Sequence, residues 1–165
     1  MPNLLTLMGV LAACVTAVTA PHWWSAIFLV LSLLLSGIDG SSVFPQYSTS
    51  NMSATLDSIA DRISEIFWAI AFYRLGVPVA WVFAFAGLAA FQEYAKARLA
   101  SVGTRNVGLV TLSDRPVRAS FLFIAILVYQ FTSSHTWVTA LAAGLTLMQA
   151  VSFFLLLRFA YKQLH

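Results

Sequence analysis

The sequence predicts an all-α integral membrane protein with six transmembrane helices, and three observations predict it. Of the 165 residues, 60% are hydrophobic and only 9% are charged, whereas roughly a quarter of the residues in soluble domains carry charge. The apolar residues gather into six continuous stretches without the alternation of half-buried strands. Lysine and arginine fall almost entirely on one side of the resulting topology. We expect residues 1–165 to form a single transmembrane domain.

The six apolar stretches approach or exceed the length of a membrane-spanning helix, which needs about 20 mostly apolar residues. They run from Leu4 to Ala20, Trp23 to Ile38, Ile59 to Leu75, Val77 to Ala95, Val117 to Phe131 and Thr136 to Ala160. The second and fifth are short, and they reach spanning length if polar residues at their ends belong to the same helices. The first lacks the basic start and the cleavage site of a secretion signal.

The basic residues predict the orientation of the chain. With the N-terminus inside, eight of the nine lysines and arginines lie at the cytoplasmic face, and only Arg74 lies outside. Both termini and the connection from Lys96 to Arg118 are therefore predicted to be cytoplasmic, in a bacterial inner membrane. The net charge of +3 is explained by this location. Membrane lipids are the expected partners, and nucleic acid is not.

Three of the six acidic residues fall in the segment from Ser36 to Arg62, around the junction of the second and third apolar stretches. Asp57 and Asp61 are four residues apart, which places them on one face of a helix. Asp39 ends the second stretch, and Gly40 after it allows close approach of a ligand to the backbone. Hard divalent cations prefer such oxygen ligands, often with substrate phosphates beside them. The spacing predicts a Mg²⁺ or Mn²⁺ site formed by the three aspartates.

A second interpretation of the same aspartates requires no metal. Asp57 would cap the third helix, and Asp61 would pair with Arg62 or with another arginine of the inner face. Glu65 continues the face of Asp57 and Asp61 one turn deeper. Ionisable residues at membrane depth usually have a function, and this favours the cation site.

The acidic stretch resembles the signature of the CDP-alcohol phosphotransferase family. That signature reads D-x-x-D-G-x-x-A-R, eight residues, then G-x-x-x-D-x-x-x-D, and this chain has Asp39-Gly40, Asp57 and Asp61 at matching spacing. The opening PNLLTL resembles the start of the family. The stretches EYAKARLASVG and GLVTLSDRPVR resemble the branch that makes phosphatidylinositol phosphate. The resemblance covers nearly the whole chain and implies six transmembrane helices and a homodimer.

The resemblance also implies an activity and a set of site residues. A phosphatidyl-type group would pass from a CDP-linked lipid to a phosphorylated polyol, and Asp61 would be the base that deprotonates the acceptor alcohol. The implied metal ligands are Asp39, Asp57 and Asp61. The implied substrate-binding residues are Asn3, Thr6, Ser36, Gly40, Ser53, Lys96, Arg98, Arg115 and Arg118. Of these, Arg98, Arg115 and Arg118 would bind the acceptor phosphate, although basic inner loops also follow from contact with anionic lipid alone.

The signature is degenerate at several positions. Ser36 replaces the first aspartate, Val43-Phe44 replaces the Ala-Arg pair, Ser53 replaces the second glycine, and Gly9 stands where an arginine is common. Serine is a neutral, weak ligand, so the cation is expected to bind weakly or not at all. The departures favour two alternatives: a partner or binding subunit without activity, or an enzyme repurposed for an apolar substrate in the same cavity. The retained aspartates favour the transferase.

Overall fold

The chain is helical throughout the part that the structure describes. The computed structural model describes residues 2–40, 51–102 and 112–164, except for the side chains of residues 2, 3, 38–40, 51, 54 and 164. The helices are α1 (Pro2–Thr19), α2 (Trp24–Gly40), α3 (Asn51–Arg74), α4 (Val79–Ser101), α5 (Arg115–Thr132) and α6 (His135–Leu164). These ranges contain no strand, so the predicted all-α class is confirmed.

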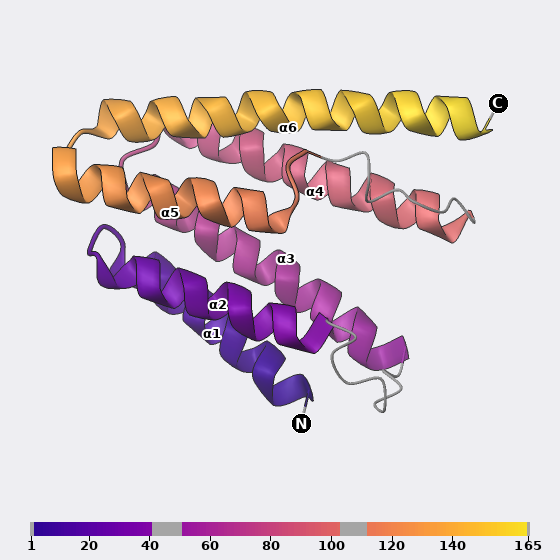
Figure 1. Cartoon of the computed structure of the whole chain (residues 1–165), viewed down its shortest axis with the longest axis horizontal. Coiled ribbons are helices and arrows are strands. Elements are labelled where there is room, and N and C mark those ends of the chain that lie inside the picture. Colours follow the sequence, from indigo (N-terminus) through magenta and orange to yellow (C-terminus); the bar gives the residue numbers. More distant parts are fainter. Residues whose placement is uncertain (1, 41–50, 103–111, 165) are drawn as a thin grey trace.

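The helices run back and forth, so that one end of the molecule collects the termini and the candidate site residues. Figure 1 shows the end of α2, the beginning of α3 and the C-terminus right of the middle of the molecule, and the N-terminus at its lower edge near the middle. The short connections from α3 to α4 and from α5 to α6 lie toward the left-hand side. Helix α1 packs against α2 and α3, and α4 packs against α6.

The connection between α3 and α4 depends on a glycine. Gly76 has a φ of 91°, which side chains other than glycine rarely adopt. A Cβ atom at this position would lie 2.0 Å from Nδ1 of His135. That nitrogen lies 2.8 Å from the carbonyl oxygen of Leu75. His135 begins α6 and joins that helix to the end of α3.

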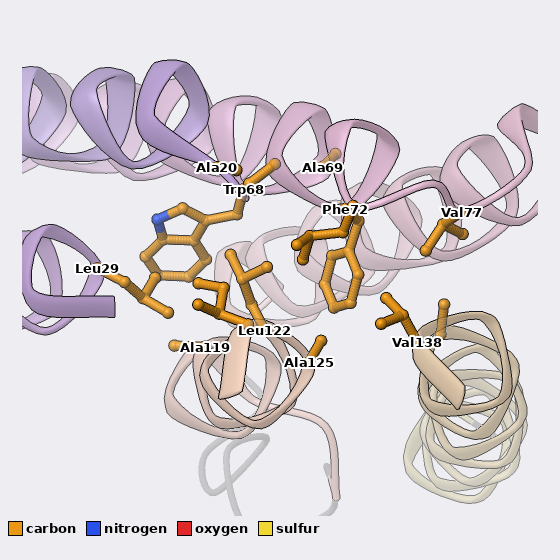
Figure 2. Close-up of a cluster of buried hydrophobic side chains, with 14 of the residues drawn as sticks. Ala20, Leu29, Trp68, Ala69, Phe72, Val77, Ala119, Leu122, Ala125 and Val138 are labelled. Atoms are coloured by element: carbon orange, nitrogen blue, oxygen red, sulfur yellow. The ribbon is translucent and has the colours of Figure 1, made fainter. Parts of the chain in front are cut away.

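The core between the helices contains aromatic, aliphatic and small side chains. Figure 2 shows Trp68 and Phe72 of α3 beside Leu122 of α5, with Leu29 of α2 next to the indole ring. All four are buried. Alanines fill the remaining space and allow the helices to approach closely, as is common between membrane helices. This core holds α2, α3 and α5 together just below the ends that carry the site residues.

The outer surface of the helices is strongly apolar, as a surface that faces lipid would be. Phenylalanines at positions 83, 91, 131 and 154 are each at least 65% exposed. One helix of the described residues, over His135–Gln163, is long and apolar enough to cross a membrane. The apolar parts of the first two helices, Leu4–Thr19 and Trp24–Gly37, are shorter.

Candidate functional site

Eight ionisable side chains form one cluster where the beginning of α5 meets α3 and α4. We call this group the charged cluster, and it consists of Asp61, Arg62 and Glu65 of α3, Glu93 and Lys96 of α4, and Asp114, Arg115 and Arg118 at the start of α5. Four carboxylates face four cations, so the cluster as a whole is electrically balanced. Buried or half-buried charges require such pairing, because the desolvation of a lone charge is costly.

Arg118 is the centre of the deeper half of the charged cluster, and its side chain is only 5% exposed. Its Nη2 donates to Glu65 at 2.6 Å and to Glu93 at 3.0 Å. Its Nη1 donates to the carbonyl oxygen of Ser113 at 2.8 Å. Three oxygen acceptors from three parts of the chain therefore fix this guanidinium in place.

Lys96 and Arg62 complete the network around these carboxylates. Lys96 lies 3.3 Å from Glu93 and 2.5 Å from Asp114. Arg62 pairs with Glu65 at 2.7 Å, one turn along α3. The network ties α3, α4 and the start of α5 together at this end of the molecule.

Arg115 is the centre of the shallower half of the charged cluster. Its Nη1 donates to Oδ1 of Asp61, and its Nη2 donates to Oγ of Ser36 at 3.2 Å. The guanidinium also lies over the indole ring of Trp68, 5.1 Å from the ring centroid. Burial lowers the pKa of the Arg115 guanidinium, and the nearby Asp61 carboxylate acts in the opposite direction. An arginine stays charged despite such a shift, so the group that contacts Asp61 here carries a permanent positive charge.

Further signature positions lie on α3 and α1. Asp57 is one turn before Asp61 on α3, and its Oδ1 accepts a hydrogen bond from the Thr6 hydroxyl at 2.7 Å. Ser53 lies in the first turn of the same helix. A Cβ atom on Gly9 would meet Oγ of Ser36 at 3.1 Å, so α1 and α2 approach closely at this level.

The structure thus brings some of the predicted site residues together and leaves others apart or undescribed. Ser36, Asp61 and Arg115 meet, and Thr6 meets Asp57. Arg98 is exposed in the last turn of α4. Gly40 ends α2, while the side chains of Asn3 and Asp39, and residues 43 and 44, lie outside the described part of the chain.

The carboxylates of Asp57 and Asp61 are suitable ligands for a divalent cation, but their hydrogen bonds to Thr6 and Arg115 compete with such an ion. Asp57 and Asp61 present hard oxygen ligands from one helix face. Within the described ranges, no three acidic, histidine or cysteine side chains converge on a point. Thr6 and Arg115 already bind the two carboxylates. A cation at Asp61 would therefore have to displace the guanidinium.

The structure has two apolar hollows, and the first of them adjoins the charged cluster. The first, of about 190 Å³, lies among α3, α4, α5 and α6 and is lined by Arg62, Glu65, Ile66, Trp68, Phe72, Phe85, Ala86, Ala89, Ala90, Arg118 and Leu145. The second, of about 400 Å³, is a more open groove along α2 and α5, lined by Leu29, Val30, Leu33, Ala119, Ser120, Phe123 and Ile124. Both are suited to hydrocarbon, and the first has polar groups at one end.

Sequence reasoning missed the deeper half of the charged cluster. It did not anticipate that Arg118 would hold Glu65 and Glu93 together, or that Asp114 would pair with Lys96. A signal was present, because Glu93 and Arg118 fall inside apolar stretches. Charges in such positions are expected to pair with each other.

Comparison with known proteins agrees with the signature. The sequence model for CDP-alcohol phosphatidyltransferases matches residues 1–156. The chain is also 30% identical, over 149 residues, to archaetidylinositol phosphate synthase from Aeropyrum pernix, and the match covers 86% of this chain and 75% of that protein. No solved structure gives a significant match. Because the family match spans nearly the whole sequence, this chain belongs to the CDP-alcohol phosphatidyltransferase family, whose members are integral membrane proteins.

Proposed function

We propose that this protein transfers a phosphatidyl-type group from a CDP-linked lipid to a phosphorylated polyol and releases CMP. The observation that carries the proposal is the meeting of Asp61 with Arg115 and Ser36 at the end of the bundle that holds the family signature. The name of the relative, archaetidylinositol phosphate synthase, denotes a product that contains inositol phosphate. This supports inositol phosphate as the acceptor.

Asp61 is the proposed general base of the transfer. The acceptor hydroxyl oxygen forms a bond to the lipid-bearing phosphorus while the bond from that phosphorus to the bridging diphosphate oxygen breaks. The hydroxyl proton passes to Asp61, and the electron pair of the broken bond leaves with CMP. Arg115 donates to the Asp61 oxygen that would accept the proton, so this contact must loosen before the acceptor hydroxyl can reach that oxygen.

The basic residues of the site are proposed to bind the phosphate groups of the substrates. Arg115 lies nearest the base, and with Lys96, Arg98 and Arg118 it would attract and orient phosphate groups. Arginine binds phosphate through two parallel hydrogen bonds, which fix orientation as well as charge. The apolar hollow beside the charged cluster and the groove along α2 and α5 would receive hydrocarbon chains of the donor.

The family generally depends on divalent cations, and we propose that Asp39, Asp57 and Asp61 would hold a Mg²⁺ or Mn²⁺ ion here. Such an ion would offset the charge of the donor diphosphate. Serine at position 36 supplies no carboxylate, and Arg115 competes at Asp61. We therefore propose weak cation binding and slow turnover, with residues 43, 44 and 53 as further departures from the signature.

Replacing Ser36 with aspartate is expected to tighten Mn²⁺ binding, because it adds an anionic oxygen ligand facing Asp61. Titration calorimetry of both proteins measures the difference. Ser36→Asn changes side-chain size in the same way without adding charge, and it should leave the affinity close to that of the unchanged protein. Equal affinity for the aspartate and asparagine variants would contradict a cation site at this position.

The transferase activity itself is tested by CMP release. Purified protein in detergent is supplied with Mg²⁺, a CDP-linked lipid and either inositol phosphate or free inositol. We expect slow CMP formation that requires the phosphorylated acceptor, because the arginines around Asp61 favour an anionic substrate. CMP formation that is equal with inositol and inositol phosphate would contradict the phosphorylated acceptor. The absence of CMP with either would contradict the transferase.

A second function is favoured by the pairing of Asp61 with Arg115. A subunit that kept the fold and lost the chemistry could retain this pair permanently. Such a protein would bind a CDP-linked lipid without releasing CMP in any assay, whereas the transferase releases it. Lipid binding without CMP release therefore selects this alternative.

We further propose that all six helices cross the membrane, with both termini and the charged cluster on the cytoplasmic side. The back-and-forth course of the helices (Figure 1) supports this topology, as does the eight-to-one division of basic residues. The homodimer suggested by the sequence stays a prediction.

Cysteine accessibility is expected to reveal this orientation. Cys14 is first replaced by serine, and single cysteines are then placed at Ser101, at the end of α4, and at Thr136, at the start of α6. Both positions are exposed. An impermeant maleimide added to intact cells should label only position 136. Labelling of position 101 from outside would reverse the topology.

A further inference from the structure

Arg115 is held by fewer groups than Arg118, although the two lie one turn apart on α5. Arg118 binds two carboxylates and a carbonyl oxygen. Arg115 binds one carboxylate and one neutral hydroxyl, the latter at 3.2 Å. Hydrogen bonds to neutral groups at such a distance are weak. Of the two arginines, Arg115 is therefore the one that can change its partner at lower cost.

Two buried N–H donors, one within this guanidinium and one in the indole ring against it, lack an acceptor among the described residues, as does Nε of Arg118. They are Nε of Arg115 itself, whose side chain is 14% exposed, and Nε1 of Trp68, over whose ring the guanidinium lies. Figure 2 shows the ring nitrogen of Trp68 on the edge of the indole away from Phe72. Buried donors normally find an acceptor. Unsatisfied donors beside a cation favour a ligand with anionic oxygens.

The balance of the charged cluster restricts how a ligand can enter. Its four carboxylates and four cations cancel, and Asp57 adds one negative charge beside Asp61. A phosphate monoester brings about −1.5 to −2 charges and would add to this negative charge if it bound alone. A divalent cation that bound alone would leave a positive excess. The two together nearly cancel, so each should favour the binding of the other.

We propose that Arg115 exchanges Asp61 for the phosphate of the acceptor, and that this exchange couples acceptor binding to cation binding at Asp61. Without a phosphate, the guanidinium holds Asp61 and excludes a cation from it. When the phosphate binds, the guanidinium and the neighbouring N–H donors turn to its oxygens, and Asp61 becomes free. This inference rests on the proposed function only in taking the acceptor to be phosphorylated.

The test measures binding and not turnover. Mn²⁺ binding to the purified protein in detergent is followed by the paramagnetic resonance signal of free Mn²⁺, with inositol phosphate, with free inositol, or with neither. Inositol phosphate is expected to tighten Mn²⁺ binding by about tenfold, within the range of roughly 5- to 150-fold usual for coupled sites. Mn²⁺ should tighten inositol phosphate binding by the same factor, because coupling is reciprocal. Free inositol should have no effect.

Substitution of Arg115 isolates its part in the coupling. Arg115→Gln should bind Mn²⁺ more tightly without phosphate, and inositol phosphate should then change that affinity by less than about twofold, below the usual coupling range. Arg158→Gln, a change at an exposed position of α6, should keep the coupling of the unchanged protein. If the Arg115→Gln protein does not fold, Arg115→Lys keeps the charge without the paired donors, and a smaller coupling is expected.

The outcomes separate this inference from the proposed function. Mn²⁺ affinity that is unaffected by inositol phosphate, or Mn²⁺ binding that is absent under all conditions, would overturn the exchange. Coupling that persists at full strength in the variant tested at position 115 would also overturn it. CMP release without coupling would support the transferase activity and contradict the exchange. Coupling without CMP release would support the exchange and contradict the transferase activity.

Discussion

Replacing Asp61 with asparagine is expected to lower the rate of CMP release by about 10²- to 10⁴-fold, the usual contribution of general acid–base catalysis. The amide has nearly the same shape and still offers an oxygen to Arg115, but it cannot accept the proton of the acceptor hydroxyl. The rate is measured with saturating CDP-linked lipid and inositol phosphate.

Binding of the CDP-linked lipid to the same preparation is the control for this variant. Because Asp61 is also a proposed cation ligand, this binding is measured without a divalent cation, and it should then remain within a few-fold of that of the unchanged protein. A large fall in lipid affinity together with the rate would indicate that Asp61 organises the site and does not act as its base. Turnover that survives the substitution would exclude Asp61 as the base.

Replacing Arg118 with methionine is expected to lower the free energy of unfolding by about 3–5 kcal/mol, the usual cost of removing one partner of a buried ion pair. Glu65 and Glu93 would lose their shared cation, and the Glu65 side chain is only 12% exposed. Reversible unfolding in mixed detergent micelles, with rising SDS, measures the change.

Two comparisons test whether charge is the cause. Arg158→Met makes the same change at an exposed position of α6, and it should alter the free energy of unfolding by no more than about 0.5 kcal/mol. Adding Glu65→Gln to Arg118→Met should recover part of the lost stability, because it removes an unpaired negative charge. Equal effects at positions 118 and 158 would show that the buried network contributes little to stability.

The helices could be predicted from the sequence, but their ends could not. Each of the six apolar stretches corresponds to a helix in the described ranges, because only helices satisfy the backbone of continuous apolar segments in lipid. The third stretch was expected to begin at Ile59, yet α3 begins at Asn51. The fourth was expected to end at Ala95, yet α4 continues to Ser101. Helical turns beyond the apolar region carry polar side chains, and a search for apolar residues does not detect them.

The candidate site was predictable only where its residues are close in the sequence. The four-residue spacing of Asp57 and Asp61 places both on one face of α3, and the alternative interpretation already allowed an inner-face arginine beside Asp61. Which arginine it is depends on how α5 packs against α3, since Arg115 lies 54 residues away. The same holds for Glu93, whose distance from Arg118 is set by the packing of α4 and α5 around the core. Local spacing carries no information on either arrangement.

The hydrogen bond from Thr6 to Asp57 has a practical consequence for handling this protein. It anchors the second turn of α1 to a signature carboxylate, and α1 also packs along α2 and α3. A purification tag fused to the N-terminus would therefore pull on the same helix that positions Asp57. The last turns of α6 are exposed around Tyr161 and Lys162. A fusion protein or affinity tag belongs at that end.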